Sequence, residues 1–308
     1  MILKALTVSV FLTAVNAASL VDVSNFGSNP TNLRMSIYVP DRPQPKAPIV
    51  LTLHGCQGNG PDFFRQSEWP SLADRYGFIV ISPTVSSGRT WGPGGCWYTE
   101  YEDVLTHNGG SDSLGLVNMV NWAVANRGGD ASRVYTMGWS SGGMETQVLL
   151  GAYPDVFKAG ASFDGVPYGC MLNTASDPSQ NTCATGQLIR TAQQWGDLAR
   201  SGYPEYTGPR PKVQIWHGTN DQIVSYKNLG ESVKQWTNIH GISATPVSTT
   251  TVAGWTRERY GNGEVEAWTE PGGGHVPPAT GLLQYVVGFF GLDQSPPQPP
   301  LPVNVFRP

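Results

Sequence analysis

The sequence predicts an α/β fold in which a mostly parallel central sheet is covered by helices on both faces. Three observations support this class. Continuous apolar runs such as 49–53 and 77–82 are typical of strands that are buried on both sides. Segments with apolar residues at helical spacing alternate with these runs along the chain. No internal repeat is visible, so a single sheet with crossover helices accounts for the pattern.

The first residues predict an export signal. The apolar run 5–15 follows an early lysine, and Val15 and Ala17 have the small side chains expected before a cleavage after Ala17. This run is too short to span a bilayer. We therefore expect a secreted, extracellular protein. The expected organisation is a signal peptide at 1–17, a catalytic domain at 18–294 and a proline-rich tail at 295–308.

The composition excludes several classes of partner. The 308 residues carry a net charge of −4, and only 14% of them are charged. Because no basic cluster appears, we expect no nucleic-acid partner. No later run is long enough to span a membrane, and we expect no membrane partner. We also expect a monomer that uses no metal and no cofactor.

The four cysteines predict two disulfides, because cysteines pair in the oxidising compartment to which an export signal leads. Three connectivities are possible. Pairing of neighbours closes the shortest loops, and we therefore predict the bonds Cys56–Cys96 and Cys170–Cys183. Their spacing does not suit a zinc site, which needs close pairs of ligands.

The first half of the chain supplies three strands and two helices. Residues 35–39 alternate between polar and apolar and end at a proline, which indicates an edge strand. The runs 49–53 and 77–82 are the buried strands, and a helix at 69–76 lies between them. The helix expected from 113 onward has apolar residues at helical spacing.

The loop after the strand at 49–53 is a candidate part of an active site. It reads His-Gly-Cys-Gln-Gly. A glycine-rich loop at this place can donate a backbone N–H to a developing negative charge. Cys56 is the candidate donor, and His54 is expected to orient the loop without taking part in catalysis.

The following loop, 83–111, is long and rich in aromatic residues. Long loops without secondary structure in compact domains are commonly functional. The rings of Trp91, Trp97 and Tyr98 either line a carbohydrate cleft or pack the loop itself. We expect Trp97 to contact the substrate.

The centre of the chain reads as a strand, a sharp turn and a helix. Residues 134–137 are β-prone, the sequence Gly-Trp-Ser-Ser-Gly at 138–142 breaks the strand, and apolar residues at helical spacing follow. In such a turn the two glycines let backbones pass closely, and the central serine stands at the end of a parallel strand. Ser140 is the predicted nucleophile, and the amide of Ser141 is the second expected oxyanion donor. This turn predicts an α/β-hydrolase fold.

The strands after this turn deliver the other candidate catalytic residues. In an α/β hydrolase the order is serine, acid, histidine. His275 lies in a glycine run that lets it reach back across the sheet, whereas His217 and His240 suit structural roles. Asp221 is the preferred acid, because it follows the penultimate strand, and Asp164 is the alternative. The strands are expected at 158–163, 212–216 and 264–268, and the helices at 187–200, around 229–236 and at 282–290.

At these motifs the sequence resembles a known family, the fungal members of carbohydrate esterase family 1, which are acetylxylan esterases and type B feruloyl esterases. The resemblance extends from residue 23 to about 291. It rests on Val-Ser-Asn-Phe-Gly at 23–27, Arg-Met-Ser-Ile-Tyr-Val-Pro at 34–40, Tyr-Gly-Phe-Ile-Val-Ile-Ser-Pro at 76–83, Leu-Thr-His-Asn-Gly-Gly at 105–110, Ser-Ser-Gly-Gly at 140–143, Gly-Val-Pro at 165–167, Arg-Pro-Lys-Val-Gln-Ile-Trp-His-Gly at 210–218 and Gly-His at 274–275.

The resemblance implies a triad of Ser140, Asp221 and His275, with the amides of Cys56 and Ser141 as the oxyanion hole. It also implies that Trp195 lies near the substrate. Two stretches depart from the family: the loop at 54–58 is closer to a polyester-depolymerase branch, and the loop at 88–104 is longer and more aromatic. Both border the expected active site and therefore affect substrate choice.

The expected function is that of a secreted serine esterase that removes acetyl groups from xylan, a plant cell-wall polysaccharide. Trp139, beside the nucleophile, takes up space that a long acyl chain would need, which favours acetate. The alternatives are a feruloyl esterase, a polyester depolymerase and, from another class, a non-catalytic carbohydrate-binding protein. An ordered set of Ser140, Asp221 and His275 argues against the last, because a binding protein does not need it.

Overall fold

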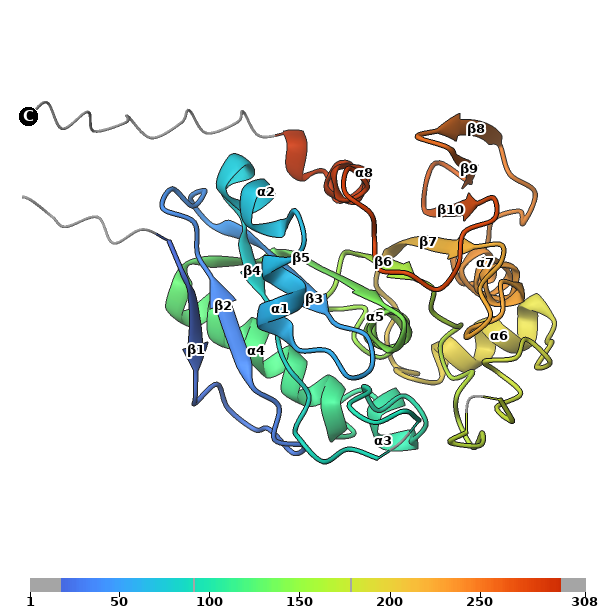
Figure 1. Ribbon diagram of the computed structural model, residues 1–308, viewed down its shortest axis with the longest axis horizontal. Helices are drawn as coiled ribbons and strands as arrows, with labels where there is room; N and C mark the ends of the chain where they lie inside the picture. The colour runs from blue at the N-terminus through green and yellow to red at the C-terminus, as the bar shows by residue number, and fades with distance from the viewer. Residues whose placement is uncertain (1–17, 91, 178, 295–308) are drawn as a thin grey trace, which may run out of the picture.

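The computed structural model describes residues 18–90, 92–177 and 179–294. The expected signal peptide, the expected proline-rich tail and Trp91 lie outside the described residues. A ten-stranded sheet runs through this part of the chain (Figure 1), with the strand order β1-β2-β4-β3-β5-β6-β7-β10-β9-β8. The strands are β1 (Leu20–Val23), β2 (Met35–Tyr38), β3 (Ala47–Leu53), β4 (Ile79–Ile81), β5 (Gly129–Trp139), β6 (Ala159–Phe163), β7 (Lys212–Gly218), β8 (Ser248–Val252), β9 (Trp255–Tyr260) and β10 (Val265–Glu270).

The middle of the sheet is parallel and its two edges are antiparallel. Strands β4, β3, β5, β6, β7 and β10 pair in parallel, while β1 and β2 at one edge and β9 and β8 at the other pair antiparallel. Figure 1 shows the two antiparallel pairs at opposite ends of the sheet. The arrangement confirms the predicted α/β-hydrolase class. Because parallel strands end at one edge, the loops after β3, β5, β6, β7 and β10 meet there.

Helices cover both faces, and the buried strands are apolar on both sides as a result. In β3, Ile49 and Leu51 face the core with α4, α5 and α7, whereas Val50 between them faces the core with α2 and α8. This is the alternation of side chains across a strand. The helices are α1 (Gly60–Arg65), α2 (Trp69–Tyr76), α3 (Glu102–Leu105), α4 (Ser111–Arg127), α5 (Ser141–Ala152), α6 (Ala192–Arg200), α7 (Lys227–His240) and α8 (Leu283–Phe289), with a short 3₁₀ helix at Leu292–Gln294.

Several elements differ from the sequence expectations. The hairpin of β8 and β9, the edge strand β1 and the short helix α1 were not predicted. Helix α6 begins at Ala192 and not at 187, because Thr191 and Gln194 form a capping box that fixes its first turn. The loop at 83–111 contains the single turn α3. None of the described helices has the length and apolar character that crossing a bilayer requires.

Both disulfides join the expected pairs of cysteines. One bond links Cys56 to Cys96 and the other links Cys170 to Cys183, across 40 and 13 positions of the chain. The first ties the loop after β3 to the aromatic loop that precedes α3. The second closes the excursion between β6 and α6. Each therefore holds a loop at the edge of the sheet where the parallel strands end.

Candidate active site

Ser140 occupies a sharp turn between β5 and α5. Its backbone has a φ of 58°, which is a strained conformation for a residue with a side chain. Two glycines make the turn possible: a Cβ at Gly138 would lie 2.2 Å from the carbonyl oxygen of Gly142, and one at Gly142 would lie 2.2 Å from that of Leu53. The amide of Ser140 donates to the carbonyl of Phe163 at 2.9 Å, which anchors the turn to β6.

His275 connects the serine to an acid. Its Nε2 lies 2.8 Å from Ser140 Oγ, and its Nδ1 lies 2.7 Å from Asp221 Oδ2. Because the carboxylate accepts at Nδ1, the neutral ring carries its proton there and leaves Nε2 free to accept the serine proton. The structure thus brings Ser140, His275 and Asp221 together, in the geometry of a nucleophile, a general base and an orienting acid.

Asp221 is buried but well supplied with hydrogen-bond donors. Its Oδ1 accepts the backbone N–H groups of Ile223 at 2.8 Å and Val224 at 2.9 Å. Its Oδ2 accepts from His275 and, at 3.1 Å, from Nε2 of His217. Burial alone would raise the pKa of Asp221, but the bonds from the two imidazoles outweigh it and hold this pKa well below its usual range. The carboxyl group is therefore a charged acceptor for His275.

His217, which the sequence predicts to have a structural role, is a direct partner of Asp221. Its Nε2 faces both Asp221 Oδ2 and the carbonyl oxygen of Val224, at 2.8 Å, so this nitrogen must carry the proton. The sequence signal for this contact was the spacing of four residues between His217, near the end of β7, and Asp221. His217 positions the carboxylate and does not reach Ser140, so we describe it as a positioning residue.

Backbone hydrogen bonds hold the His275 loop against the Asp221 loop. Asn220 N donates to Gly273 O at 2.8 Å, and Gly272 N donates to Thr219 Oγ1 at 2.7 Å. The approach is close at Gly218, where a Cβ would lie 2.4 Å from Gly273 O. The glycine run before His275 therefore packs against β7 and fixes the distance between the imidazole and its acid.

The loop after β3 is fixed from several sides. Besides the Cys56–Cys96 disulfide, Gln57 donates from its backbone to Gly95 O at 3.2 Å. His54 is buried, which lowers its pKa to about 4, and its ring contacts Gly55 O at 2.6 Å and Val85 N at 3.4 Å. A neutral His54 that bonds to the backbone on both sides supports the orienting role expected for it.

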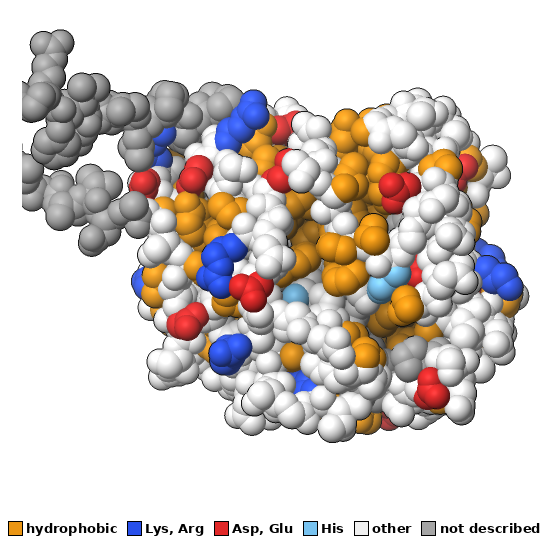
Figure 2. Space-filling model, viewed as in Figure 1, with side chains coloured by type: hydrophobic (Ala, Val, Ile, Leu, Met, Phe, Trp, Pro, Cys, Tyr) orange, Lys and Arg blue, Asp and Glu red, His pale blue; other side chains and the backbone are white. Residues whose placement is uncertain are grey.

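A cavity of about 180 Å³ opens at Ser140, and we call it the catalytic cavity. Both expected oxyanion residues, Cys56 and Ser141, line it together with Ser140 and His275. Its apolar lining comes from the end of β5, from α5 and from the segments that follow β6 and β7. These residues are Trp139, Met144, Met171, Ala184, Ile223 and Val224. Figure 2 shows histidine atoms in a hollow of the surface where hydrophobic side chains gather.

The alternative acid, Asp164, lies beside the triad with different partners. Its Oδ2 accepts the indole N–H of Trp139 at 3.1 Å, and its Oδ1 accepts Gly218 N at 3.4 Å. Its φ of 49° marks a second strained turn, at the end of β6. Burial raises the pKa of Asp164 to about 6. Its carboxyl group thus holds Trp139, whereas Asp221 bonds to His275.

The three tryptophans expected to contact substrate differ in the structure. Trp139 is half-buried and lines the catalytic cavity. Trp97 and Trp195 have no exposed surface, so neither ring can contact a substrate, contrary to the prediction. Trp97 donates to His54 O at 2.8 Å, and Trp195 donates to Glu231 at 2.7 Å. Large aromatic side chains with an internal partner for the indole N–H are stable in a core, and the sequence alone does not show that partner.

One group of side chains has the composition of a metal site. Asp164, Asp221 and His275 each offer one potential ligand atom, and these atoms lie within 4.8 Å of one another. Both ring nitrogens of His275 already face Ser140 and Asp221, and the carboxyl oxygens accept N–H groups. Hydrogen bonding therefore accounts for this cluster.

The chain is similar to known proteins over most of its length. The sequence model of a protein family, described as Esterase PHB depolymerase, matches residues 33–261 of this chain. A protein named feruloyl esterase B from Talaromyces funiculosus is 43% identical over 286 residues, which cover 91% of this chain and 79% of that protein. An acetylxylan esterase from Coprinopsis cinerea is 41% identical over 287 residues, which cover 90% and 74%.

A solved structure supports the same relationship. The acetyl xylan esterase from Aspergillus awamori superimposes with a TM-score of 0.81 at 35% sequence identity, covering 89% of this chain and 99% of that one. An S-formylglutathione hydrolase from Staphylococcus aureus, with a TM-score of 0.54 and 14% identity, shares the fold alone. The same fold thus occurs in proteins whose names give different activities.

Proposed function

The chain is a carboxylic ester hydrolase of the Esterase PHB depolymerase family, and from this premise we propose that it removes acetyl groups from plant xylan with Ser140, His275 and Asp221 as its catalytic residues. The observation that carries the proposal is the hydrogen-bonded chain from Ser140 Oγ through His275 to Asp221, which opens into an apolar cavity. An acyl group bound there lies next to the serine oxygen.

The proposed reaction proceeds through an acyl-enzyme. Ser140 Oγ attacks the ester carbonyl carbon while His275 Nε2 takes the serine proton. The carbonyl oxygen becomes negative and accepts hydrogen bonds from the amides of Cys56 and Ser141. His275 then gives its proton to the departing sugar oxygen. A water molecule next attacks the acyl carbon while His275 Nε2 takes a proton from it, and this proton passes to Ser140 Oγ as the acid leaves. Asp221 stabilises the charged imidazolium throughout.

The size of the catalytic cavity favours a short acyl group. Its volume of about 180 Å³ is below the roughly 300–1,000 Å³ of sites for drug-sized ligands. Acetate fits beside Trp139, whereas a long acyl chain would have to displace the apolar lining. The names of the relatives include acetylxylan esterase, which supports acetylated xylan as the substrate.

Feruloyl esters are the second candidate substrates. Relatives named feruloyl esterase B are 41–44% identical to this chain. The indole of Trp139 offers an aromatic surface on which a phenolic ring can pack. The thioether groups of Met144 and Met171 line the same cavity and also pack well on such a ring. The third candidate substrate is a polyester, as the words PHB depolymerase in the family description suggest.

The two disulfides support export, because such bonds persist in oxidising compartments. The cleavage after Ala17 and the monomeric state remain predictions.

A substrate panel tests the proposal. We expect the purified enzyme to release acetate from acetylxylan with a higher kcat/KM than it releases ferulate from methyl ferulate, and to leave a polyester film intact. With p-nitrophenyl acetate, butyrate and octanoate, kcat/KM should fall as the chain lengthens. Rates that rise with chain length would reject the acetate assignment, and a preference for methyl ferulate would move the enzyme to the second candidate.

A further inference from the structure

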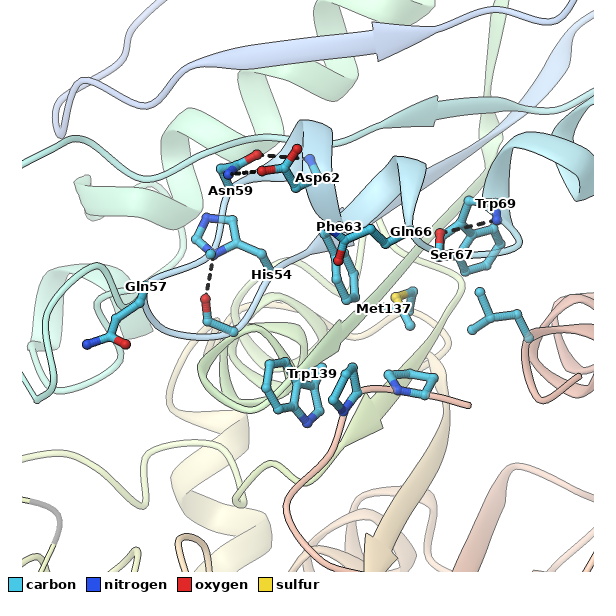
Figure 3. Close-up of a pocket in the computed structure, with 15 residues that line it drawn as sticks. His54, Gln57, Asn59, Asp62, Phe63, Gln66, Ser67, Trp69, Met137 and Trp139 are labelled. Carbon is cyan, nitrogen blue, oxygen red and sulfur yellow. Dashed lines mark hydrogen bonds between the residues drawn. The ribbon is translucent and has the colours of Figure 1, made fainter. Parts of the chain in front are cut away.

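A second pocket lies on the other side of Trp139 from the catalytic cavity. Its volume is about 330 Å³, and α1, the end of β5 and the segment after His275 form its walls. Figure 3 shows Phe63 pointing from α1 toward Trp139 across this space, with Gln66 beside it. We call it the Phe63 pocket, after the ring that closes it. Its lining does not include Ser140, so it is distinct from the site of bond cleavage.

We propose that the Phe63 pocket binds uncharged xylose units of the polysaccharide main chain, adjacent to the acylated sugar, and so positions the leaving group. This inference rests on the proposed function. It assigns the two sides of the ester to two cavities: the acyl group to the catalytic cavity and the main chain to the Phe63 pocket.

The position of the catalytic groups determines which cavity takes which part of the ester. The expected oxyanion donors, Cys56 and Ser141, line the catalytic cavity, so the carbonyl group points there. The leaving oxygen must lie at His275 Nε2, because this nitrogen returns the proton. Pro277 and Pro278, just beyond His275, line the Phe63 pocket. The alcohol side of the ester therefore runs past His275 into this pocket.

The chemistry of the lining favours a sugar over an acyl chain. Phe63 and Trp139 present aromatic surfaces, and the flat faces of a pyranose ring carry C–H groups that pack on such surfaces. Gln66 adds an amide group to this lining, where sugar hydroxyls need hydrogen-bond partners. The catalytic cavity is lined by Met144, Met171, Ile223 and Val224 beside the serine, and these apolar side chains suit an acyl group.

The charge of the lining favours an uncharged unit. Among the fifteen described residues that line the pocket, none is lysine or arginine. Asp62 is the acid among them, and it pairs with Arg65 at 2.8 Å and accepts from Asn59. An acidic sugar would find no cation among these lining residues to compensate its charge. The pocket therefore selects plain xylose units over those that carry uronic acid side groups.

Trp139 forms the wall between the two cavities and is held on two sides. Its indole N–H donates to Asp164, and a Cβ at Gly55 would lie 2.6 Å from its ring, so the ring packs directly on the loop after β3. Its ring centroid lies 5.4 Å from that of His275. A sugar packed on the outer face of Trp139 is therefore close to the imidazole that protonates its oxygen.

The test compares acetylated xylo-oligosaccharides, which have a chain of xylose units, with p-nitrophenyl acetate, which has none. We expect Phe63→Ala to lower kcat/KM for acetylated xylo-oligosaccharides about tenfold and to leave p-nitrophenyl acetate within twofold of the native enzyme. Gln66→Ala should lower the first value about threefold, because it removes one hydrogen-bonding group and no apolar contact. Tyr101→Ala is the matched control, since this exposed ring lines neither cavity.

A binding measurement separates this inference from the proposed function. Titration of Ser140→Ala with xylohexaose that carries no acyl groups should show saturable binding, and Ser140→Ala combined with Phe63→Ala should bind at least tenfold more weakly. Should the native enzyme fail to deacetylate xylan, the proposed function falls, and this titration still decides the pocket. Equal losses on both substrates, undiminished xylohexaose binding, or a changed preference for acyl chain length in Phe63→Ala would each overturn the inference.

Discussion

The ends of β6 and β7 each bury an aspartate beside His275, but the two carboxyl groups have different partners. Asp221 accepts two backbone N–H groups and two imidazole N–H groups, whereas Asp164 accepts the indole of Trp139 and a longer bond from Gly218 N. Burial opposes the charge of both. The pKa of Asp221 nevertheless lies well below its usual range, while that of Asp164 is raised to about 6.

This difference shows that burial near a histidine does not by itself make a catalytic acid. The partners decide whether the carboxyl group stays charged in the folded state. Asp221 is held as an anion that can stabilise an imidazolium, and Asp164 is held as an anchor for the wall between two cavities. Variants of His275 and of both aspartates test this division of roles.

The largest losses are expected from Ser140→Ala and His275→Ala. Each should lower kcat by about 10⁵-fold or more, because triad members act as a unit and either change removes the activated serine oxygen. The melting temperature should change little, since neither side chain fills a core. Turnover of p-nitrophenyl acetate and circular dichroism measure the two effects. A variant that kept a tenth of the activity would contradict the assignment of that residue.

Asp221→Asn should be the next most severe change. The amide cannot stabilise a charged imidazole and favours the wrong tautomer of His275, so we expect a loss of about 10⁴-fold in kcat. The variant should also be less stable at pH 7, because the charged carboxylate gains its donors only in the folded state. His217→Leu is a useful companion. It removes one donor to Asp221 without touching Ser140, and should cost less activity than Asp221→Asn.

The segments that follow the two strands are stabilised by different means. The loop after β7 is fixed by hydrogen bonds to Asp221 and to the glycine run, whereas the excursion after β6 is closed by Cys170–Cys183. Replacing both cysteines by serine should lower the free energy of unfolding by about 3 kcal/mol, since the bond closes a short loop. Denaturant unfolding measures this. A loss below about 1 kcal/mol would show that packing alone holds the excursion.

The sequence predicted the parallel core of the sheet because its strands are continuous apolar runs. It did not predict the hairpin of β8 and β9, since the residues of β8 are largely exposed threonines with no apolar alternation. An edge strand of this kind is defined by its pairing with a neighbour, which only the folded chain supplies.

The candidate site was predictable to a similar extent. Ser140, Asp221 and His275 could be chosen because each follows a strand end, in a fixed order along the chain. The second donor to Asp221 and the bond between Asp164 and Trp139 could not, because they depend on which side chains meet across neighbouring strands. Trp97 was misassigned for the same reason: the sequence shows a large ring but not the direction in which it points.

Asp164→Asn is the mildest change and the most informative one about the comparison. Asparagine keeps an oxygen for the indole of Trp139 and removes only the charge, so we expect less than about a tenfold change in kcat/KM. Steady-state kinetics with p-nitrophenyl acetate at pH 7 measure this change.

The stability of this variant should depend on pH in the opposite sense to that of Asp221→Asn. The pKa of Asp164 is raised from 3.8 to about 6 on folding, so between these values the unfolded chain has lost a proton that the folded protein keeps. The free energy of unfolding of the native protein therefore falls as pH rises through this window, and the fall is absent in Asp164→Asn.

We expect the variant to match the native protein near pH 4 and to melt at a higher temperature at pH 7. Thermal melts of both aspartate variants at the two pH values, with Tyr101→Ala as a surface control, measure this. If Asp164→Asn lost more activity than Asp221→Asn and melted lower at pH 7, the roles of the two carboxyl groups would have to be exchanged.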